Sequence, residues 1–370
     1  MDSRKTFARI DLGAYSRNLA FFEEHCAPAR VAPVIKADGY GHGACQLARA
    51  VEAKAFPYFV VAFLEEAISL REAGVRSPIL VLNWFEPERV GELLHWDLTA
   101  TLFCERQMEA LEAQLFSGVL PVHVILDTGM SRLGFRPQQL ERVAARMRKT
   151  RRFRWDGLYT HLATADEPDL ERSRVQIREF SEVASQFRGD VRWVHVSNSA
   201  GALHLPEGLY DFVRVGIASY GLDPSNQKRP AGLSPVLHWQ TAVAMVKEIP
   251  RGTGVSYGWT FVAPRSMKVA TIPVGYADGY NRLLSNTGQV LIQGKRAPIL
   301  GRVCMDQFVV DVSHLEAVEM GEPVVLLGKM GSEEMSCEEM ANRVQTINYE
   351  ITCRISSRVP RIFTQTGEAV

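Results

Sequence analysis

The sequence predicts an α/β protein, namely a (β/α)8 TIM barrel followed by a mainly β C-terminal domain. Three observations carry this prediction. Eight short runs rich in β-branched residues alternate with amphipathic segments between about residues 29 and 220. After about residue 235, strand-like runs recur without long helices between them. The length of 370 residues suits two domains.

The barrel strands are predicted from runs of β-branched and apolar side chains. The runs are residues 31–37, 58–63, 78–83, 97–103, 121–128, 155–162, 192–199 and 212–219. Helical spacing of apolar residues is clear in the intervening segments 65–74, 104–115 and 171–187. A doubly wound sheet is the alternative, but the turn after the first strand carries no GxGxxG motif.

The second domain is predicted from five strand-like regions, which are 238–249, 267–277, 288–302, 307–312 and 322–328. A helix is expected from Ser336, which forms a capping-box pattern with Glu339, and a second over 347–355. We therefore divide the chain into a barrel, residues 1–234, and a β domain, residues 235–370. The first ten or so residues are expected to pair with the β domain.

Composition excludes several classes of protein. Lys and Arg number 42, as do Asp and Glu, so the chain lacks the basic excess of a nucleic-acid-binding protein. No apolar run reaches the roughly 20 residues of a membrane span, and no signal peptide is evident. The six cysteines lack zinc spacing, so no metal is expected. A soluble cytoplasmic protein is the expectation.

Polar side chains gather where the predicted barrel strands end, at the face where barrels carry their chemistry. Lys36 ends the first strand, and Arg132 follows the fifth in LDTGMSRLGF. The later strands contribute His161, Asn198, Ser199, Arg214 and Gly216. Each residue alone has an ordinary structural explanation, but their convergence from five strands favours a site.

A lysine in this position suggests Schiff-base chemistry, because burial lowers the pKa of an ammonium group and supplies a neutral amine. If the aldehyde belongs to pyridoxal phosphate, the site also needs a phosphate cradle. Barrels often build one from the loops after strands seven and eight. Here the backbone N–H groups of Ser199, Gly216 and Ile217 are candidates, and Gly216 permits close approach.

The chain resembles alanine racemases over nearly its whole length. The matching segments include VAPVIKADGYGHG, LDTGMSRLGF, THLATADEPD, VSNSAG, RVGIASYGLDPS, VSYG, PVGYADG, GRVCMDQ and NYEITCRI. The resemblance implies interconversion of L- and D-alanine with pyridoxal phosphate, supplying D-alanine for peptidoglycan. It also implies a homodimer with shared active sites.

The resemblance assigns roles to matching positions. Lys36 would hold the cofactor covalently, and the other implied cofactor contacts are Tyr40, His161, Asn198, Ser199, Arg214, Gly216, Ile217 and Tyr349. Tyr257 would be the second catalytic base, donated by the other subunit. Arg132 and Met305 would hold the substrate carboxylate, with Asp306 and Tyr276 nearby.

The chemistry accounts for these residue types. Racemisation removes a proton from one face of the substrate and returns one to the other, so it needs two bases, Lys36 and Tyr257. Tyrosine has a pKa near 10, so nearby cations must stabilise its phenolate, and His161 and Arg214 are the expected sources. Arg214 cannot accept a proton, so a cofactor ring nitrogen facing it would stay neutral.

One position departs from the family pattern. Many relatives carry a carbamylated lysine two residues before the Asp of the DTGM motif, where it braces the substrate-binding arginine. Here Ile125 occupies that position and offers no charge to Arg132. The hypothesis is that a bound anion or another side chain supports Arg132 instead.

Other functions remain open at this point. A racemase that prefers serine or another small amino acid would share the same bases. A related barrel decarboxylase is disfavoured by the short chain. A pyridoxal-phosphate-binding regulatory protein without turnover would not need the β domain with Tyr257.

Overall fold

The computed structural model describes residues 5–365, and contacts group these into two compact units. The barrel unit comprises Ser16–Gly39 and Ala44–Ser219. The β unit comprises the described residues up to Tyr15, Tyr40–Gly43 and the described residues from Tyr220 onward. The predicted boundary between residues 234 and 235 stays a prediction.

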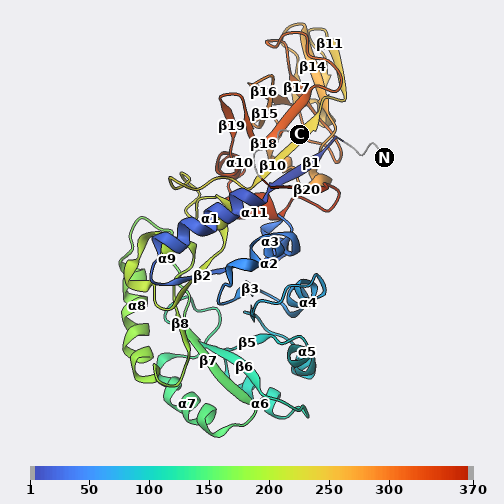
Figure 1. The fold of residues 1–370 in the computed structure, drawn as a ribbon. Helices are drawn as coiled ribbons and strands as arrows, with labels where there is room; N and C mark the ends of the chain where they lie inside the picture. The colour runs from blue at the N-terminus through green and yellow to red at the C-terminus, as the bar shows by residue number, and fades with distance from the viewer. Residues whose placement is uncertain (1–4, 366–370) are drawn as a thin grey trace. The chain divides into compact units, whose positions relative to one another are not determined.

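Eight parallel strands form the barrel, which confirms the predicted fold class (Figure 1). They are β2 (Arg30–Pro33), β3 (Phe59–Val61), β4 (Ile79–Val81), β5 (Thr99–Leu102), β6 (Leu120–Ile125), β7 (Phe153–Tyr159), β8 (Trp193–His195) and β9 (Phe212–Val215). Strands β3 to β8 pair in sequence order, and β2 pairs with β9. A bridge between Val34 and Val60 joins β2 to β3, and the Asp211 N–H donates to the Val194 carbonyl to join β9 to β8.

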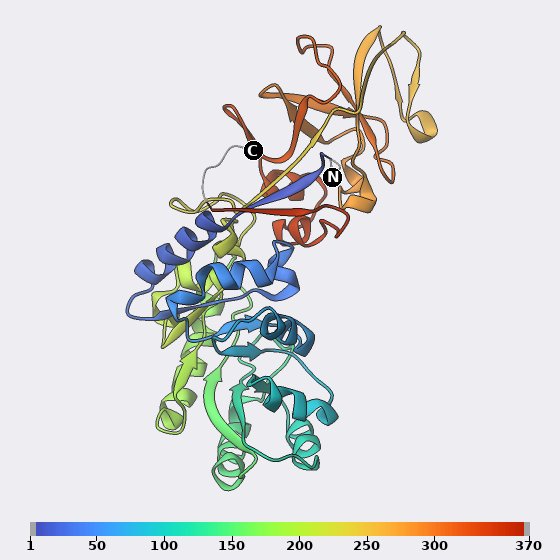
Figure 2. The same cartoon turned by 45° about the vertical axis from the view of Figure 1, so that its right-hand side comes forward.

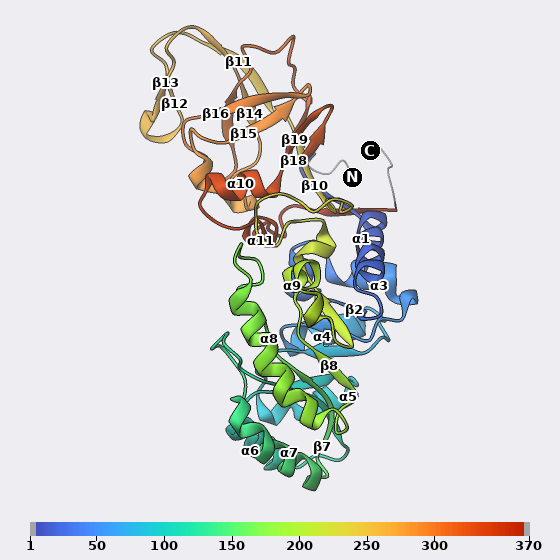
Figure 3. The same cartoon turned by 90° about the vertical axis from the view of Figure 1, so that its left-hand side faces the viewer.

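Helices follow the strands around the outside of the barrel, as α6, α7 and α8 show in Figure 3. The helices of this region are α1 (Leu12–His25), α2 (Lys36–Tyr40), α3 (Ala44–Val51), α4 (Leu64–Glu72), α5 (Val90–His95), α6 (Glu105–Glu112), α7 (Leu140–Lys149), α8 (Glu171–Ala184) and α9 (Ser199–His204). Their apolar stripes cover the strands, which explains why β3 to β6 are buried at every position.

Most predicted barrel strands extend too far toward their carboxyl ends. The first stops at Pro33 rather than residue 37, and the last stops at Val215 rather than residue 219. The chain leaves the sheet at the barrel mouth and turns into short helices there. Several residues assigned to strand ends, Lys36 and Ser199 among them, therefore lie in helices or loops that follow the strands.

A ten-stranded sheet forms the core of the β unit. Its strands are β1 (Phe7–Asp11), β10 (Leu237–Ala242), β11 (Met245–Ile249), β14 (Met267–Ile272), β15 (Gln289–Ile292), β16 (Lys295–Leu300), β17 (Phe308–Asp311), β18 (Pro323–Met330), β19 (Glu333–Met335) and β20 (Arg361–Thr364). The run 238–249, predicted as one strand, is divided into β10 and β11 at Val243–Ala244. The chain leaves one part of the sheet there and re-enters elsewhere, because β10 pairs with β18 and β11 with β14.

The N-terminal strand β1 lies between β10, to which it runs antiparallel, and β20, to which it runs parallel. Figure 2 shows β1 in blue beside β20 in red. Residues 1–4 of the predicted N-terminal pairing segment lie outside the described residues. A separate ribbon, β12 (Gly254–Val255) and β13 (Phe261–Val262), brackets the short helix Tyr257–Trp259.

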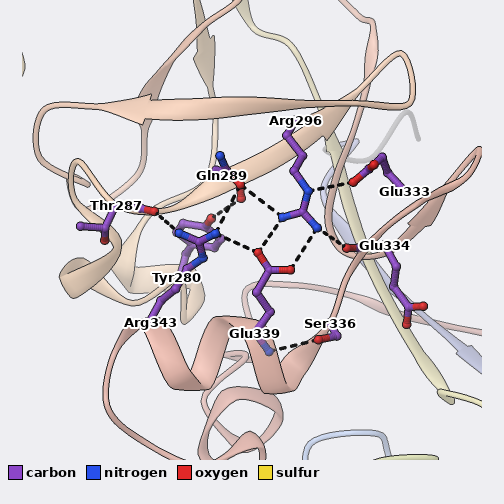
Figure 4. Close-up of polar contacts among 9 residues, drawn as sticks. All are labelled: Tyr280, Thr287, Gln289, Arg296, Glu333, Glu334, Ser336, Glu339 and Arg343. Carbon is purple, nitrogen blue, oxygen red and sulfur yellow. Dashed lines mark hydrogen bonds and ion pairs between the residues drawn. The ribbon is translucent and has the colours of Figure 1, made fainter. Parts of the chain in front are cut away.

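A partly buried ion-pair network joins this sheet to the α-helix α10 (Cys337–Arg343) (Figure 4). The α-helix α11 (Asn348–Cys353) follows it in the chain. The Arg296 guanidinium donates to Glu339 at 2.6 and 3.1 Å and to Glu333 at 2.8 Å. Arg343 donates to the same Glu339 carboxylate at 2.9 Å. Only half of the predicted capping box forms. Ser336 caps the helix by accepting from the Glu339 N–H, but the Glu339 carboxylate binds the two arginines instead.

Loss of the Glu339 charge is expected to weaken the fold. Burial raises the pKa of Glu339, but the hydrogen bonds from Arg296 and Arg343 outweigh it and lower the pKa overall. Glu339→Gln should therefore lower the free energy of unfolding by about 1–3 kcal/mol near neutral pH. Because a lowered pKa contributes stability above its unfolded value of about 4.3, the difference should shrink as the pH falls from about 6 to about 3.5.

Urea unfolding of the whole chain across this pH range is the measurement. Glu319→Gln is the matched control, because Glu319 is an exposed glutamate of the same unit. A Glu339→Gln deficit that does not change with pH would contradict the electrostatic explanation.

Candidate active site at the barrel mouth

A pocket of about 190 Å³ opens where the barrel strands end. It brings together four of the predicted site residues, Lys36, Arg132, His161 and Arg214. They come from segments that follow β2, β6 and β7 and from β9 itself. The other lining residues are Ala62, Leu82, Asn83, Ile125, Leu126, Met130, Leu133 and Tyr159. Cations and apolar side chains therefore share one concave surface, as expected of a small-molecule site.

Lys36 begins α2, where the backbone is strained. Ala37, Asp38, Gly39 and Tyr40 all have φ between 50 and 61°. A left-handed backbone costs roughly 1–2 kcal/mol for each residue other than glycine, so such strain persists only where its surroundings enforce it. The Glu66 carboxylate accepts from the Ala37 N–H at 2.6 Å, and Asp38 accepts from the Ala44 N–H at 2.8 Å. These bonds hold the turn that follows Lys36.

Hydrogen bonds to four acceptors hold the Arg214 guanidinium in the pocket. Its guanidinium donates to the carbonyls of Thr160 and Val196, both at 2.9 Å, and to ring nitrogens of His195 at 2.6 Å and His161 at 3.1 Å. It also lies over the Tyr159 ring, 5.1 Å from the centroid. Burial lowers the pKa of Arg214 to about 10, so the side chain remains a cation at neutral pH.

His161 is a neutral acceptor. Burial and the nearby charges, with Arg214 first among them, lower the pKa of His161 well below its usual value. Because an arginine has only donors, the His161 Nδ1 must accept from Arg214 and carries no proton. The expectation that His161 supplies positive charge is therefore wrong, and Arg214 is the other expected source.

The segments predicted to hold a phosphate lie side by side. The Ser199 hydroxyl accepts from the Gly216 N–H at 2.9 Å and from the Ala218 N–H at 3.4 Å. Asn198 caps α9, accepting from the Gly201 N–H at 2.9 Å, and its amide donates to the Leu162 carbonyl at 3.3 Å. Ile217 follows Gly216 directly and is buried.

The remaining predicted residues belong to the β unit. The rings of Tyr40 and Tyr349 lie 6.0 Å apart. The Tyr276 N–H donates to the Cys304 carbonyl, and the Met305 carbonyl accepts from the Ala277 N–H, both at 3.0 Å.

Three of the side chains in the β unit are notably open to solvent in the single chain. Tyr257 is 72% exposed, Met305 52% and Tyr276 43%. Asp306 pairs with Arg358 at 2.7 Å.

Ile125 is buried on β6 and lines the pocket with Arg132. Within residues 5–365, no side chain forms a hydrogen bond or ion pair with Arg132. Within one chain, no described side chain therefore takes the place of the missing lysine. The alternative, a bound anion, stays a prediction.

Sequence reasoning missed Tyr159 and His195. Both lie within predicted strands, whereas the site residues were predicted only at the ends of the strands. The available signal was a polar residue at an inward position of an otherwise apolar strand, as in WVHV around His195.

Among the described residues, no cluster of three or more His, Cys, Asp or Glu side chains could hold a metal ion. None of the described helices is both long and apolar enough to cross a membrane.

A (β/α)8 barrel whose mouth holds a strand-end lysine, a buried arginine and a neutral histidine, together with a mainly β domain, defines a two-domain barrel enzyme. The family model for the alanine racemase N-terminal domain matches residues 10–224, and that for the C-terminal domain matches residues 236–363. The chain therefore belongs to the alanine racemase family, a family of isomerases.

Individual relatives agree over their whole length. The chain is 43% identical to the alanine racemase of Carboxydothermus hydrogenoformans, covering 97% of this chain and 100% of that one. It is 38% identical to the alanine racemase of E. faecalis, whose crystal structure matches with a TM-score of 0.93 over 98% of each chain. A structure of the Bacillus anthracis enzyme with bound L-Ala-P matches with a TM-score of 0.93 at 36% identity, over 100% of this chain and 97% of that one.

The cap at Asn198 gives a test of how the segment predicted to bind phosphate is held. Asn198→Ala should lower the free energy of unfolding by about 1 kcal/mol, because the Gly201 N–H loses its acceptor. Asn198→Asp keeps an acceptor oxygen and should lose less. Urea unfolding compares the two variants, and an equal loss in both would show that the cap is not responsible.

Proposed function

We propose that this chain is an alanine racemase that interconverts L- and D-alanine with pyridoxal phosphate and two bases, Lys36 and Tyr257. The observation that carries the proposal is the pocket in which Lys36 lies with the cationic Arg214 and the neutral His161. Membership of the family supports the same assignment. Supply of D-alanine for peptidoglycan is part of the proposal, and a cytoplasmic location stays a prediction.

The residues present fit pyridoxal phosphate. When bound, this cofactor supplies an aldehyde that reacts with amines and a ring that withdraws electrons. Lys36 offers the amine. Because the Ser199 hydroxyl already accepts two N–H groups, its proton is free to be donated to a phosphate oxygen. Tyr40, Asn198, Gly216, Ile217 and Tyr349 complete the proposed cofactor contacts.

Arg214 and His161 define the proposed ring environment. Arg214 only donates hydrogen bonds, so a ring nitrogen facing it would keep its lone pair unprotonated. His161, held neutral by burial and by Arg214, offers an aromatic face without adding charge. This arrangement limits how strongly the ring withdraws electrons, and it favours return of the proton over other reactions of the substrate.

Proton movement is assigned to two side chains. Lys36 takes or returns the α-proton on one face of the substrate, and Tyr257 does so on the other. Arg132 and the Met305 backbone hold the substrate carboxylate, which fixes the α-carbon between the two bases. Tyr276 and Asp306 border the same substrate region.

We also propose a homodimer with shared sites. Tyr257 and Met305 are more than half exposed in the single chain, although the proposed chemistry requires them beside the substrate. A second copy of the chain would cover these side chains and complete each site, as the symmetry of a twofold dimer allows. The division into a barrel at 1–234 and a β domain at 235–370 belongs to this proposal.

The activity is tested by chiral chromatography. Purified protein with added pyridoxal phosphate and L-alanine should form D-alanine, and Lys36→Ala should abolish it because the amine is lost. Lys54→Ala is the matched control, because Lys54 lies in an ion pair with Glu23 outside the pocket. Dominant formation of D-serine from L-serine would retain the bases and change the substrate. No D-product from any small amino acid, despite bound cofactor, would contradict the proposal.

Shared sites are tested by mixing subunits. Lys36→Ala and Tyr257→Phe homodimers should each be inactive. Each heterodimer has one site that combines both defects and one site without either. Random exchange should therefore restore about a quarter of wild-type activity, since about half the dimers are mixed and half of their sites are intact. Confirmed heterodimers without recovery would show that Tyr257 acts within its own chain.

A further inference from the structure

A continuous chain of buried polar side chains crosses the barrel interior from Arg214 to Tyr58. Arg214 donates to the His195 Nδ1 at 2.6 Å, and the His195 Nε2 lies 2.9 Å from the His123 Nδ1. The His123 Nε2 lies 3.3 Å from the Tyr58 hydroxyl. Both histidines have no exposed surface. The assignments above use Arg214 but leave the two histidines and Tyr58 without a role.

Arg214 determines the direction of every hydrogen bond in this series of four side chains. A guanidinium has no acceptor, so the His195 Nδ1 must present its lone pair to Arg214. The proton of neutral His195 is then on Nε2, from which it is donated to the His123 Nδ1. His123 must in turn carry its proton on Nε2 and donate to Tyr58. No other assignment of protons satisfies all three contacts.

Both imidazoles are uncharged near neutral pH. Burial, followed by the charge of Arg214, lowers the pKa of His123 to about 3. Burial and the same charge lower the pKa of His195 well below its usual value. A doubly protonated His195 would also direct an N–H at Arg214, which the 2.6 Å contact does not permit.

The packing around the two rings limits their rotation. The His195 ring lies between Tyr159, with centroids 4.5 Å apart, and Phe212, at 4.2 Å, and it is nearly parallel to both. The His123 ring lies against Gly157, where an added Cβ would come within 2.5 Å of Nδ1. The β6–β7 register also shifts beside His123. The absence of a side chain at Gly157 thus makes room for the His123 ring.

We propose that His123 is a positioning residue. By accepting from the His195 Nε2–H, it fixes the position of the His195 ring, whose Nδ1 accepts from Arg214, so that Arg214 presents a fixed set of donors to the pocket. Tyr58 does the same for His123 from the far end. The benefit to catalysis rests on the proposed racemase function, whereas the proton arrangement itself does not.

The arrangement is tested directly by nitrogen NMR of the wild-type holoenzyme with ¹⁵N-labelled histidine. Protonated and unprotonated ring nitrogens give separate signals, and single-histidine substitutions assign them. Both His123 and His195 should show a protonated Nε2 and an unprotonated Nδ1 from about pH 8 to about pH 5. A protonated Nδ1 on either ring, or a charged ring at neutral pH, would overturn the proposal.

Variants at His123 then test its effect on Arg214. His123→Leu removes the acceptor, so the His195 Nε2–H loses its hydrogen bond and the His195 ring-nitrogen signals should shift. His123→Asn places an amide oxygen near the former Nδ1 and should preserve the wild-type His195 signals. His314→Gln is the control, because His314 is an exposed histidine of the β unit. Unchanged His195 signals in a folded His123→Leu protein would show that His123 only fills space.

Kinetics provide a second readout. His123→Leu should lower kcat by about tenfold or more with little change in KM, because the Arg214 donors lose their fixed direction. His123→Asn should recover most of that loss. A KM effect alone, or an equal loss in both variants, would contradict the positioning role. If the wild type makes no D-amino acid at all, the proposed function fails, and the NMR result still decides the proton arrangement.

Discussion

The buried charge of Arg214 is the constraint on which the rest of the barrel mouth depends. An arginine that is buried away from water needs hydrogen-bond acceptors for its N–H groups. Without them, its burial would cost several kcal/mol of folding free energy. Two carbonyls and two histidine nitrogens meet this need. Because arginine only donates, it also determines the protonation of its neighbours. His161 and His195 are consequently neutral, and the cationic character of the pocket is concentrated in its lysine and arginines.

The strained turn after Lys36, which follows the strand paired with that of Arg214, has a similar logic. Four successive left-handed residues follow Lys36, and two carboxylates hold them by accepting backbone N–H groups. Glu66 reaches this turn from α4, so the helix after the second strand secures the lysine after the first. Neighbouring βα units therefore support each other at the mouth.

In the β unit, the residues that stabilise the fold are separate from those proposed to act in the reaction. One group of its ion pairs, around Arg296 and Glu339, joins strands to a helix. The side chains of Tyr257, the proposed base, and of Met305, whose backbone is proposed to bind substrate, are instead open to solvent. A side chain with so few contacts contributes little to the fold of a single chain. Such a side chain can act on a substrate once a second copy of the chain covers it, and we therefore propose that two copies complete the site.

The sequence by itself determined the fold class and the strand-end residues, because hydrophobic periodicity and the position of a residue after a strand are local properties. It led to Lys36, Arg132, His161 and Arg214, which the structure brings into one pocket. Only the tertiary structure decided the charge of His161 and the directions of the bonds through His195. A pKa and a tautomer depend on burial and on partners distant in the chain, and no local pattern encodes either. The extent of the strands and the division at Val243 were decided in the same way, by where the barrel mouth and the sheet partners lie.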